Sequence, residues 1–122
     1  MELKRNVIVT MTFEFAVSIV LLCRNLAKDR ECVFRSQLLK CATSIGANVE
    51  EAIGAQSRKD FIAKMSIAKK EAREARYWLR LHDLTKIEPV NYSEYLNSIE
   101  SIINILTKII MTTESRGNNP KG

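Results

Sequence analysis

Residues 44–81 read SIGANVEEAIGAQSRKDFIAKMSIAKKEAREARYWLRL, and this stretch decides the fold. Apolar side chains recur at spacings of three and four residues on both sides of a short polar segment, which is typical of two amphipathic helices. Gly54 can end the first helix, and Ser57 can cap the second through the amides of its first turn. The core stripe predicted for the second helix consists of Phe61, Met65, Ala68, Ala72, Ala75 and Leu79.

The same periodicity extends over most of the 122 residues. It predicts four helices and then a disordered tail, at about residues 7–27, 34–55, 58–82, 92–113 and 114–122 respectively. Pro89 is excluded from a helix interior, and Asn91 has capping-box spacing to Glu94 at the start of the last helix. Helices of this length with short loops predict one all-α domain, an up-down-up-down antiparallel four-helix bundle.

The first predicted helix is more apolar than a lone bundle requires. The set that we assign to the core is Val9, Phe13, Ala16, Val20, Cys23 and Ala27. A second set, roughly 90° away around the helix, is Phe15, Ile19, Leu22 and Leu26. Since about one stripe per helix suffices in a bundle, the surplus predicts a homo-oligomer; a wider core within the monomer is the alternative.

The composition is typical of a soluble helical protein. Charged residues make up 27% of the chain, and there are only four glycines and two prolines. Three cysteines spaced nine residues apart fit neither a metal knuckle nor a paired disulfide framework, so we expect free thiols in the cytoplasm. Glu14 interrupts the most apolar segment, residues 7–23. A membrane span needs about 20 predominantly apolar residues, so we expect no membrane partner.

Motifs for catalysis, metals and cofactors are absent from the sequence. Di-iron bundles use Glu-x-x-His pairs, and the single histidine, His82, does not follow a glutamate by three residues. Cys41 lies in an apolar row without a histidine near it, and neither GxGxxG nor GxxxxGK occurs. We therefore expect no enzyme and no cofactor, and we place His82 at the surface near a helix C-terminus.

Polar side chains line the flanks of the second and third helices where burial is expected. This polar row comprises Gln37, Ser44, Asn48, Glu51, Glu71, Glu74 and Trp78. If the two flanks face each other, a hydrogen-bonded network could fix the helix register. A subunit interface and a ligand pocket are the alternatives, and the carboxylates Glu51, Glu71 and Glu74 could at most hold a hard cation.

A basic row on the third helix is the best candidate for a functional surface. It consists of Lys69, Arg73, Arg76 and Arg80, with Lys70 and Tyr77 nearby. These side chains lie within about 17 Å, close enough to span several phosphates. The net charge of +5 permits such binding, although an ordinary solvated face is the alternative because aromatic residues for base stacking are scarce. The leading interpretation is a non-catalytic protein that binds RNA or a nucleoprotein, and the rival is a protein-interaction scaffold.

The run from Gln37 to Leu81 closely resembles the small four-helix-bundle proteins encoded in intervening sequences of bacterial 23S rRNA genes. The likeness includes FEFA, Phe13 to Ala16, and covers nearly the whole chain, with the last helix the least distinctive. The departures are Lys40 where an arginine is usual, Ala75 where a threonine is frequent, and His82 where a second leucine is common.

This resemblance implies a ring-like homopentamer of bundles, often named a ribosomal protein. The family is similar in fold to the accessory variability proteins of diversity-generating retroelements, which form basic pentameric barrels and bind a reverse transcriptase and nucleic acid. A reverse transcriptase is thus an expected partner if the gene belongs to a retroelement. The family has no accepted catalytic residues to carry over.

Overall fold

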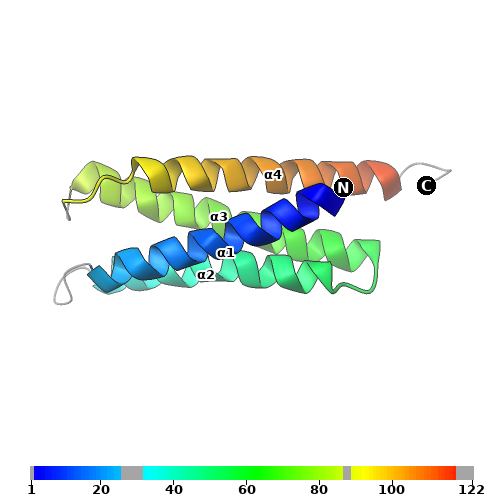
Figure 1. Cartoon of the computed structure of the whole chain (residues 1–122), viewed down its shortest axis with the longest axis horizontal. Helices are drawn as coiled ribbons and strands as arrows, with labels where there is room; N and C mark the ends of the chain where they lie inside the picture. Colours follow the sequence, from blue (N-terminus) through cyan, green and yellow to red (C-terminus); the bar gives the residue numbers. More distant parts are fainter. Residues whose placement is uncertain (1, 26–31, 87–88, 118–122) are drawn as a thin grey trace.

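The computed structural model describes residues 2–25, 32–86 and 89–117. They form four helices: α1 (Glu2–Asn25), α2 (Cys32–Ile53), α3 (Arg58–Thr85) and α4 (Ser93–Gly117). Successive helices run in opposite directions, so that α1 begins and α4 ends at the same end of the molecule (Figure 1). The backbone of each helix runs close to those of two others, while the backbones of the diagonal pairs α1/α3 and α2/α4 lie farther apart. At one end of the bundle the Arg5 guanidinium of α1 still reaches the Phe61 ring of α3, 4.6 Å from its centroid. The predicted all-α up-down-up-down bundle is confirmed.

Local sequence signals set several helix ends. The Ser57 side chain accepts a hydrogen bond from the amide of Asp60 at 3.0 Å, as the capping pattern predicted. The Asn91 side chain accepts one from the amide of Ser93, also at 3.0 Å, at the start of α4. The third helix ends one turn later than predicted, where Lys86 adopts a left-handed conformation with φ of 56°.

The outer bounds of the bundle differ from those predicted. α1 begins at Glu2, well before residue 7. α4 continues through Gly117, so residues 114–117 are helical and do not belong to a disordered tail. Residues 26–31 and 118–122, which include Leu26 and Ala27 of the predicted stripes, lie outside the described residues.

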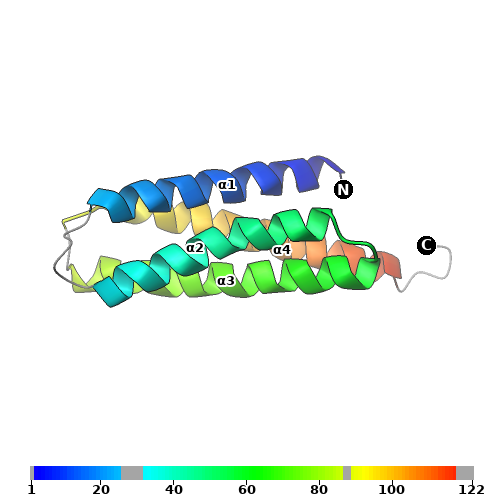
Figure 2. The same cartoon turned by 90° about the horizontal axis from the view of Figure 1, so that it is seen from below.

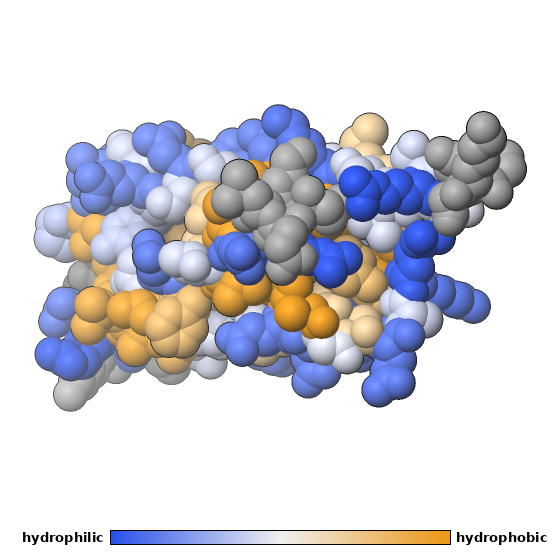
Figure 3. Space-filling model, turned by 45° about the vertical axis from the view of Figure 1, so that its right-hand side comes forward, coloured by the Kyte–Doolittle hydropathy of each residue, from blue (hydrophilic) through white to orange (hydrophobic). Residues whose placement is uncertain are grey.

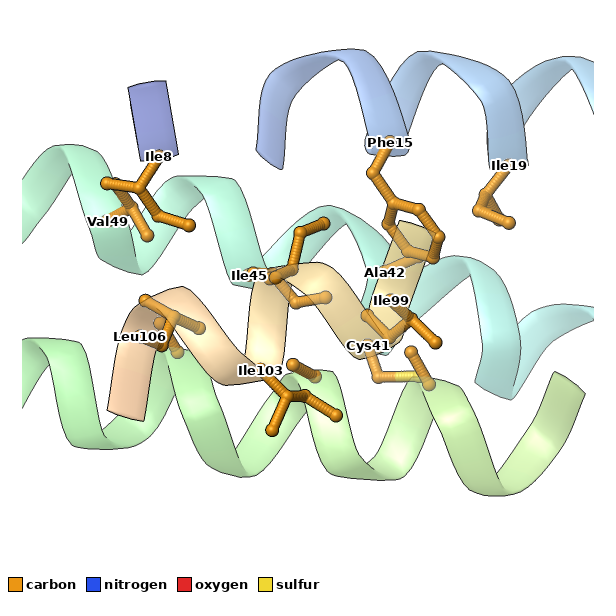
Figure 4. Close-up of a cluster of buried hydrophobic side chains, with 14 of the residues drawn as sticks. Ile8, Phe15, Ile19, Cys41, Ala42, Ile45, Val49, Ile99, Ile103 and Leu106 are labelled. Carbon is orange, nitrogen blue, oxygen red and sulfur yellow. The ribbon is translucent and has the colours of Figure 1, made fainter. Parts of the chain in front are cut away.

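The core runs along the inside of the bundle and draws on all four helices (Figure 4). α1 supplies Phe15 and Ile19, which are 3% and 0% exposed, whereas Phe13 and Val20 are 61% and 45% exposed. The assignment of Phe13 and Val20 to the bundle core was therefore wrong, and the second set points inward. Both sets obey helical spacing, so only the packing of α1 against α2 and α4 decides the rotation of the helix.

α1 is also long and apolar enough, by length and composition alone, to cross a membrane. A helix that packs in the core of a soluble bundle passes the same test. Here Phe15, Ile19 and Leu22 are buried against the other helices. The absence of a membrane partner stays a prediction.

Gly46 of α2 faces Thr12 of α1 across the contact between these helices. A Cβ atom at Gly46 would lie 3.5 Å from both the carbonyl oxygen and the hydroxyl oxygen of Thr12. Thr12 is itself buried, and its hydroxyl donates to the carbonyl of Ile8 at 2.7 Å. A single Cβ would make ordinary van der Waals contact here, so the approach of the helices excludes long side chains at this position but does not require glycine.

Substitutions at Gly46 should separate helix propensity from packing. Gly46→Ala should raise the free energy of unfolding by up to about 1 kcal/mol, because a Cβ fits at van der Waals distance and alanine favours the helix. Gly46→Leu should lower it by about 1–3 kcal/mol, because the longer side chain must displace Thr12. Urea unfolding followed by circular dichroism measures both. Ala47→Leu at the exposed neighbouring position is the control, and a Gly46→Leu protein as stable as that control would contradict the close packing.

Candidate nucleic-acid interface

The outer face of α3 brings the predicted basic row together. All five of its residues line one surface groove of about 630 Å³, which α4 borders through Ile110. They are Lys69, Lys70, Arg73, Arg76 and Arg80. We call this the basic groove. Lys70, Arg73 and Arg80 are exposed, while Lys69 and Arg76 are partly buried.

The basic groove sits on a rigid support. The opposite face of α3 is its predicted core stripe, every member of which is buried. Alanines make up half of that stripe, at positions 68, 72 and 75, and such small side chains let α3 approach its neighbours closely. The cationic side chains therefore project from a helix whose own position is set by the core.

Arg76 differs from the other members of the groove because it is paired. Its Nη1 donates to the two carboxylate oxygens of Glu100 on α4, at 2.8 and 3.2 Å. A pair this open to water adds little to stability, but it cancels the charge of Arg76. No ion pair within the described parts of the chain involves Lys69, Lys70, Arg73 or Arg80. Among the described residues, four unpaired cations thus line the groove together with one carboxylate, that of Glu74.

An aromatic side chain, Tyr77, lies in the same groove. The residue is 56% exposed, and its ring meets the ring of Trp78 edge to face, with centroids 5.4 Å apart and planes at 79°. Trp78 in turn packs against Phe34 of α2 at 5.6 Å. The sequence analysis found few aromatic residues to interleave with the cations. The four-residue spacing from Arg73 to Tyr77 is the signal that places one on their face.

The predicted polar row forms no network across α2 and α3 among the residues that the structure describes. The Ser44 hydroxyl donates to the carbonyl of Lys40, and the Asn48 amide donates to the carbonyl of Ser44, both at 2.8 Å and both within α2. Gln37 and Glu51 are exposed, so water satisfies them. A role for this row in a subunit interface stays a prediction.

Glu71 and Cys41 show that the two flanks do face each other. Burial raises the pKa of the Glu71 carboxyl, with Glu74 as the second cause, while Lys70 and Lys40 oppose the shift. Burial also raises the pKa of the Cys41 thiol to about 12, and the charges of Glu71 and Glu74 add to that effect. The thiol stays protonated at neutral pH, which suits a core residue and not a nucleophile.

Carboxylates do not gather into a cation site in the part of the chain that the structure describes. Glu51, Glu71 and Glu74 belong to no group of three or more acidic, histidine or cysteine side chains that could hold a metal ion. Cys23 and Cys41 are buried free thiols, and the side chain of Cys32 lies outside the described residues. The polar row therefore offers no support for metal binding.

His82 is buried, with 2% of its surface exposed, and the prediction of a surface position was wrong. Its ring packs edge to face against Phe34 at 5.6 Å and Tyr92 at 5.7 Å, and its Nδ1 lies 3.3 Å from the Tyr92 hydroxyl. The physical reason is that α3 continues to Thr85, so His82 extends the core stripe three residues beyond Leu79.

Comparison with known proteins gives the same architecture. The family model described as 23S rRNA-intervening sequence protein matches residues 4–108, which include the whole basic groove except its border at Ile110. A crystal structure of a protein of unknown function from the S23 ribosomal protein family of Bacteroides thetaiotaomicron is 44% identical, with a TM-score of 0.82. The similarity covers 88% of this chain and 98% of that chain. No curated protein matches.

Proposed function

The chain belongs to the 23S rRNA-intervening sequence protein family, and from this premise we propose that it is a non-catalytic, oligomeric bundle protein that binds RNA through the basic groove. One observation carries the proposal. Four cations without an ion pair in the described residues, Lys69, Lys70, Arg73 and Arg80, share one groove. Such a strip attracts phosphates by releasing their condensed counterions.

The oligomeric part of the proposal rests on the outer face of α1. Large apolar side chains are 39–61% exposed there, and Figure 3 shows this hydrophobic surface at the lower left of the view. They are Val7, Phe13, Val17, Val20 and Leu21. We call this the α1 apolar face. A contiguous apolar surface of this kind favours association, and a second copy of the chain offers the same surface.

Assembly through α1 would leave the basic groove open. α1 and α3 are diagonal in the bundle and lie on opposite sides of the molecule (Figure 2). Several copies joined through their α1 apolar faces would therefore present several basic grooves to one RNA. Such multivalent binding raises the overall affinity above that of a single groove.

Salt dependence of RNA binding tests the proposed function. Four phosphate contacts predict that the logarithm of the association constant falls with the logarithm of the salt concentration with a slope of about −3 for a single strand. Fluorescence anisotropy with a labelled RNA gives both affinity and slope. The proposal is overturned by no binding at low salt, or by binding that is independent of salt.

Glu100→Gln should strengthen RNA binding. The change releases Arg76 from its ion pair and adds one cation to the groove, so affinity should rise severalfold at low salt and the slope should steepen by about 0.7. The same anisotropy titration measures both quantities. Glu94→Gln, at an exposed carboxylate in the first turn of α4, is the control for the loss of one negative charge. Equal gains in the two variants would show that net charge alone is responsible.

The α1 apolar face also favours a second candidate function, a scaffold that binds other proteins without nucleic acid. Capture of a protein partner that persists after nuclease treatment, together with salt-independent or absent RNA binding, would favour the scaffold. Loss of the partner on nuclease treatment would favour the RNA-binding function.

A further inference from the structure

The exposure of Tyr77 in the basic groove calls for an explanation. Tyrosine side chains gain free energy by burial, yet Tyr77 as a residue keeps more than half of its surface open to water. No hydrogen bond joins its hydroxyl to another residue in the part of the chain that the structure describes. The ring is nevertheless held in place, because Trp78 contacts its edge or face and is itself packed on Phe34 of α2.

The geometry of this aromatic pair leaves a flat surface available. In an edge-to-face contact one ring directs its edge at the face of the other. Trp78 therefore covers at most one face of the Tyr77 ring, whichever ring supplies the edge. At least one face stays uncovered by Trp78 in the groove, and a flat exposed face is what a nucleic-acid base stacks on.

The cations that flank Tyr77 stand where the neighbouring phosphates would lie. Arg73 precedes Tyr77 by four residues and Arg80 follows it by three, so both are its neighbours on the helix surface, with Cβ atoms about 5–6 Å away. Arg73 and Arg80 both line the same groove. A base on the ring would thus have a cation on each side along the helix axis.

From this arrangement we infer that the basic groove takes single-stranded RNA, with an unpaired base stacked on Tyr77 and the backbone phosphates on Arg73 and Arg80. This inference rests on the proposed function and names its ligand class. A double-stranded RNA keeps its bases stacked inside the helix, so it could use the cations of the groove but not the ring. Stacking on Tyr77 therefore discriminates between single and double strands, and a positive strip alone would not.

The test compares three ligands of about ten nucleotides: a single-stranded RNA, the same strand annealed to its complement, and a strand of the same length without bases. Tyr77→Ala should weaken binding of the single-stranded RNA about tenfold, while Tyr77→Phe keeps the ring and should bind like the wild type. The base-free strand should bind both the wild type and Tyr77→Ala equally. The salt slope should not change, because no charge is removed.

Two results would overturn the inference: Tyr77→Ala binds the single-stranded RNA as tightly as the wild type, or the duplex binds at least as tightly as the single strand. Neither result would contradict the proposed function of RNA binding. That function is contradicted by a different result, namely that charge reversal at Arg73 and Arg80 leaves RNA binding intact. Tyr77 is exposed, and thermal unfolding of the Tyr77→Ala and Tyr77→Phe proteins checks that the fold is kept.

Discussion

Reversing the charge at Arg73 and Arg80 is expected to reduce RNA affinity by at least about a hundredfold at low salt. The Arg73→Glu, Arg80→Glu variant removes two of the four cations without an ion pair among the described residues and places two carboxylates against the phosphates. The salt slope should also fall to near zero, because the two remaining cations are offset. Anisotropy titrations over a range of salt concentrations measure both changes.

The control for this variant has the same change in net charge, but at positions outside the basic groove. Arg24 and Lys108 are exposed on α1 and α4 and do not line the basic groove, so Arg24→Glu, Lys108→Glu changes the net charge by the same amount elsewhere. This control should retain most of the affinity. Equal losses in both variants would show that the overall charge attracts RNA and that the groove has no special part. Exposed positions on a helix surface should leave the melting temperature almost unchanged.

Placing charges on the α1 apolar face should convert the assembled protein to a monomer. The wild type should assemble at micromolar concentration, and Phe13→Glu, Val20→Glu should have the mass of one chain, 13.9 kDa, by light scattering. Burying an unpaired carboxylate in an apolar interface costs several kcal/mol of association free energy. Two such carboxylates per chain should therefore prevent association. Both side chains are exposed in the single chain, so the bundle itself should stay folded.

Met111→Glu is the matched control for the assembly. Met111 is 62% exposed on α4, as open as Phe13, but it does not belong to the α1 apolar face. Its substitution should leave the assembled mass unchanged. A wild type that is monomeric at micromolar concentration would contradict the assignment of the α1 apolar face to self-association, and dissociation by Met111→Glu would place the interface elsewhere.

The two experiments probe separate surfaces. Because α1 and α3 lie diagonally across the bundle, a monomeric variant should keep an intact basic groove. Such a monomer should bind RNA with the salt slope of a single groove but with lower overall affinity than the assembly. The charge-reversed variant should stay assembled.

Features within one helix could be predicted from the sequence alone. The stripe of α3 from Phe61 to Leu79 is buried as its spacing predicted, and Ser57 caps the helix as its position predicted. The basic row of α3 was predicted for the same reason, since residues three and four apart on a helix are always neighbours. Local geometry determines all of these, and it needs no knowledge of the other helices.

Features that depend on how helices meet were decided only by the tertiary structure. The outward direction of Phe13, the pairing of Arg76 with Glu100 and the burial of His82 each depend on a neighbouring helix. Two apolar stripes on α1 obey one period, so the period cannot say which faces the core. The sequence by itself determined the four helices and the cations of α3, and the packing of the bundle determined which of those side chains are left free to act.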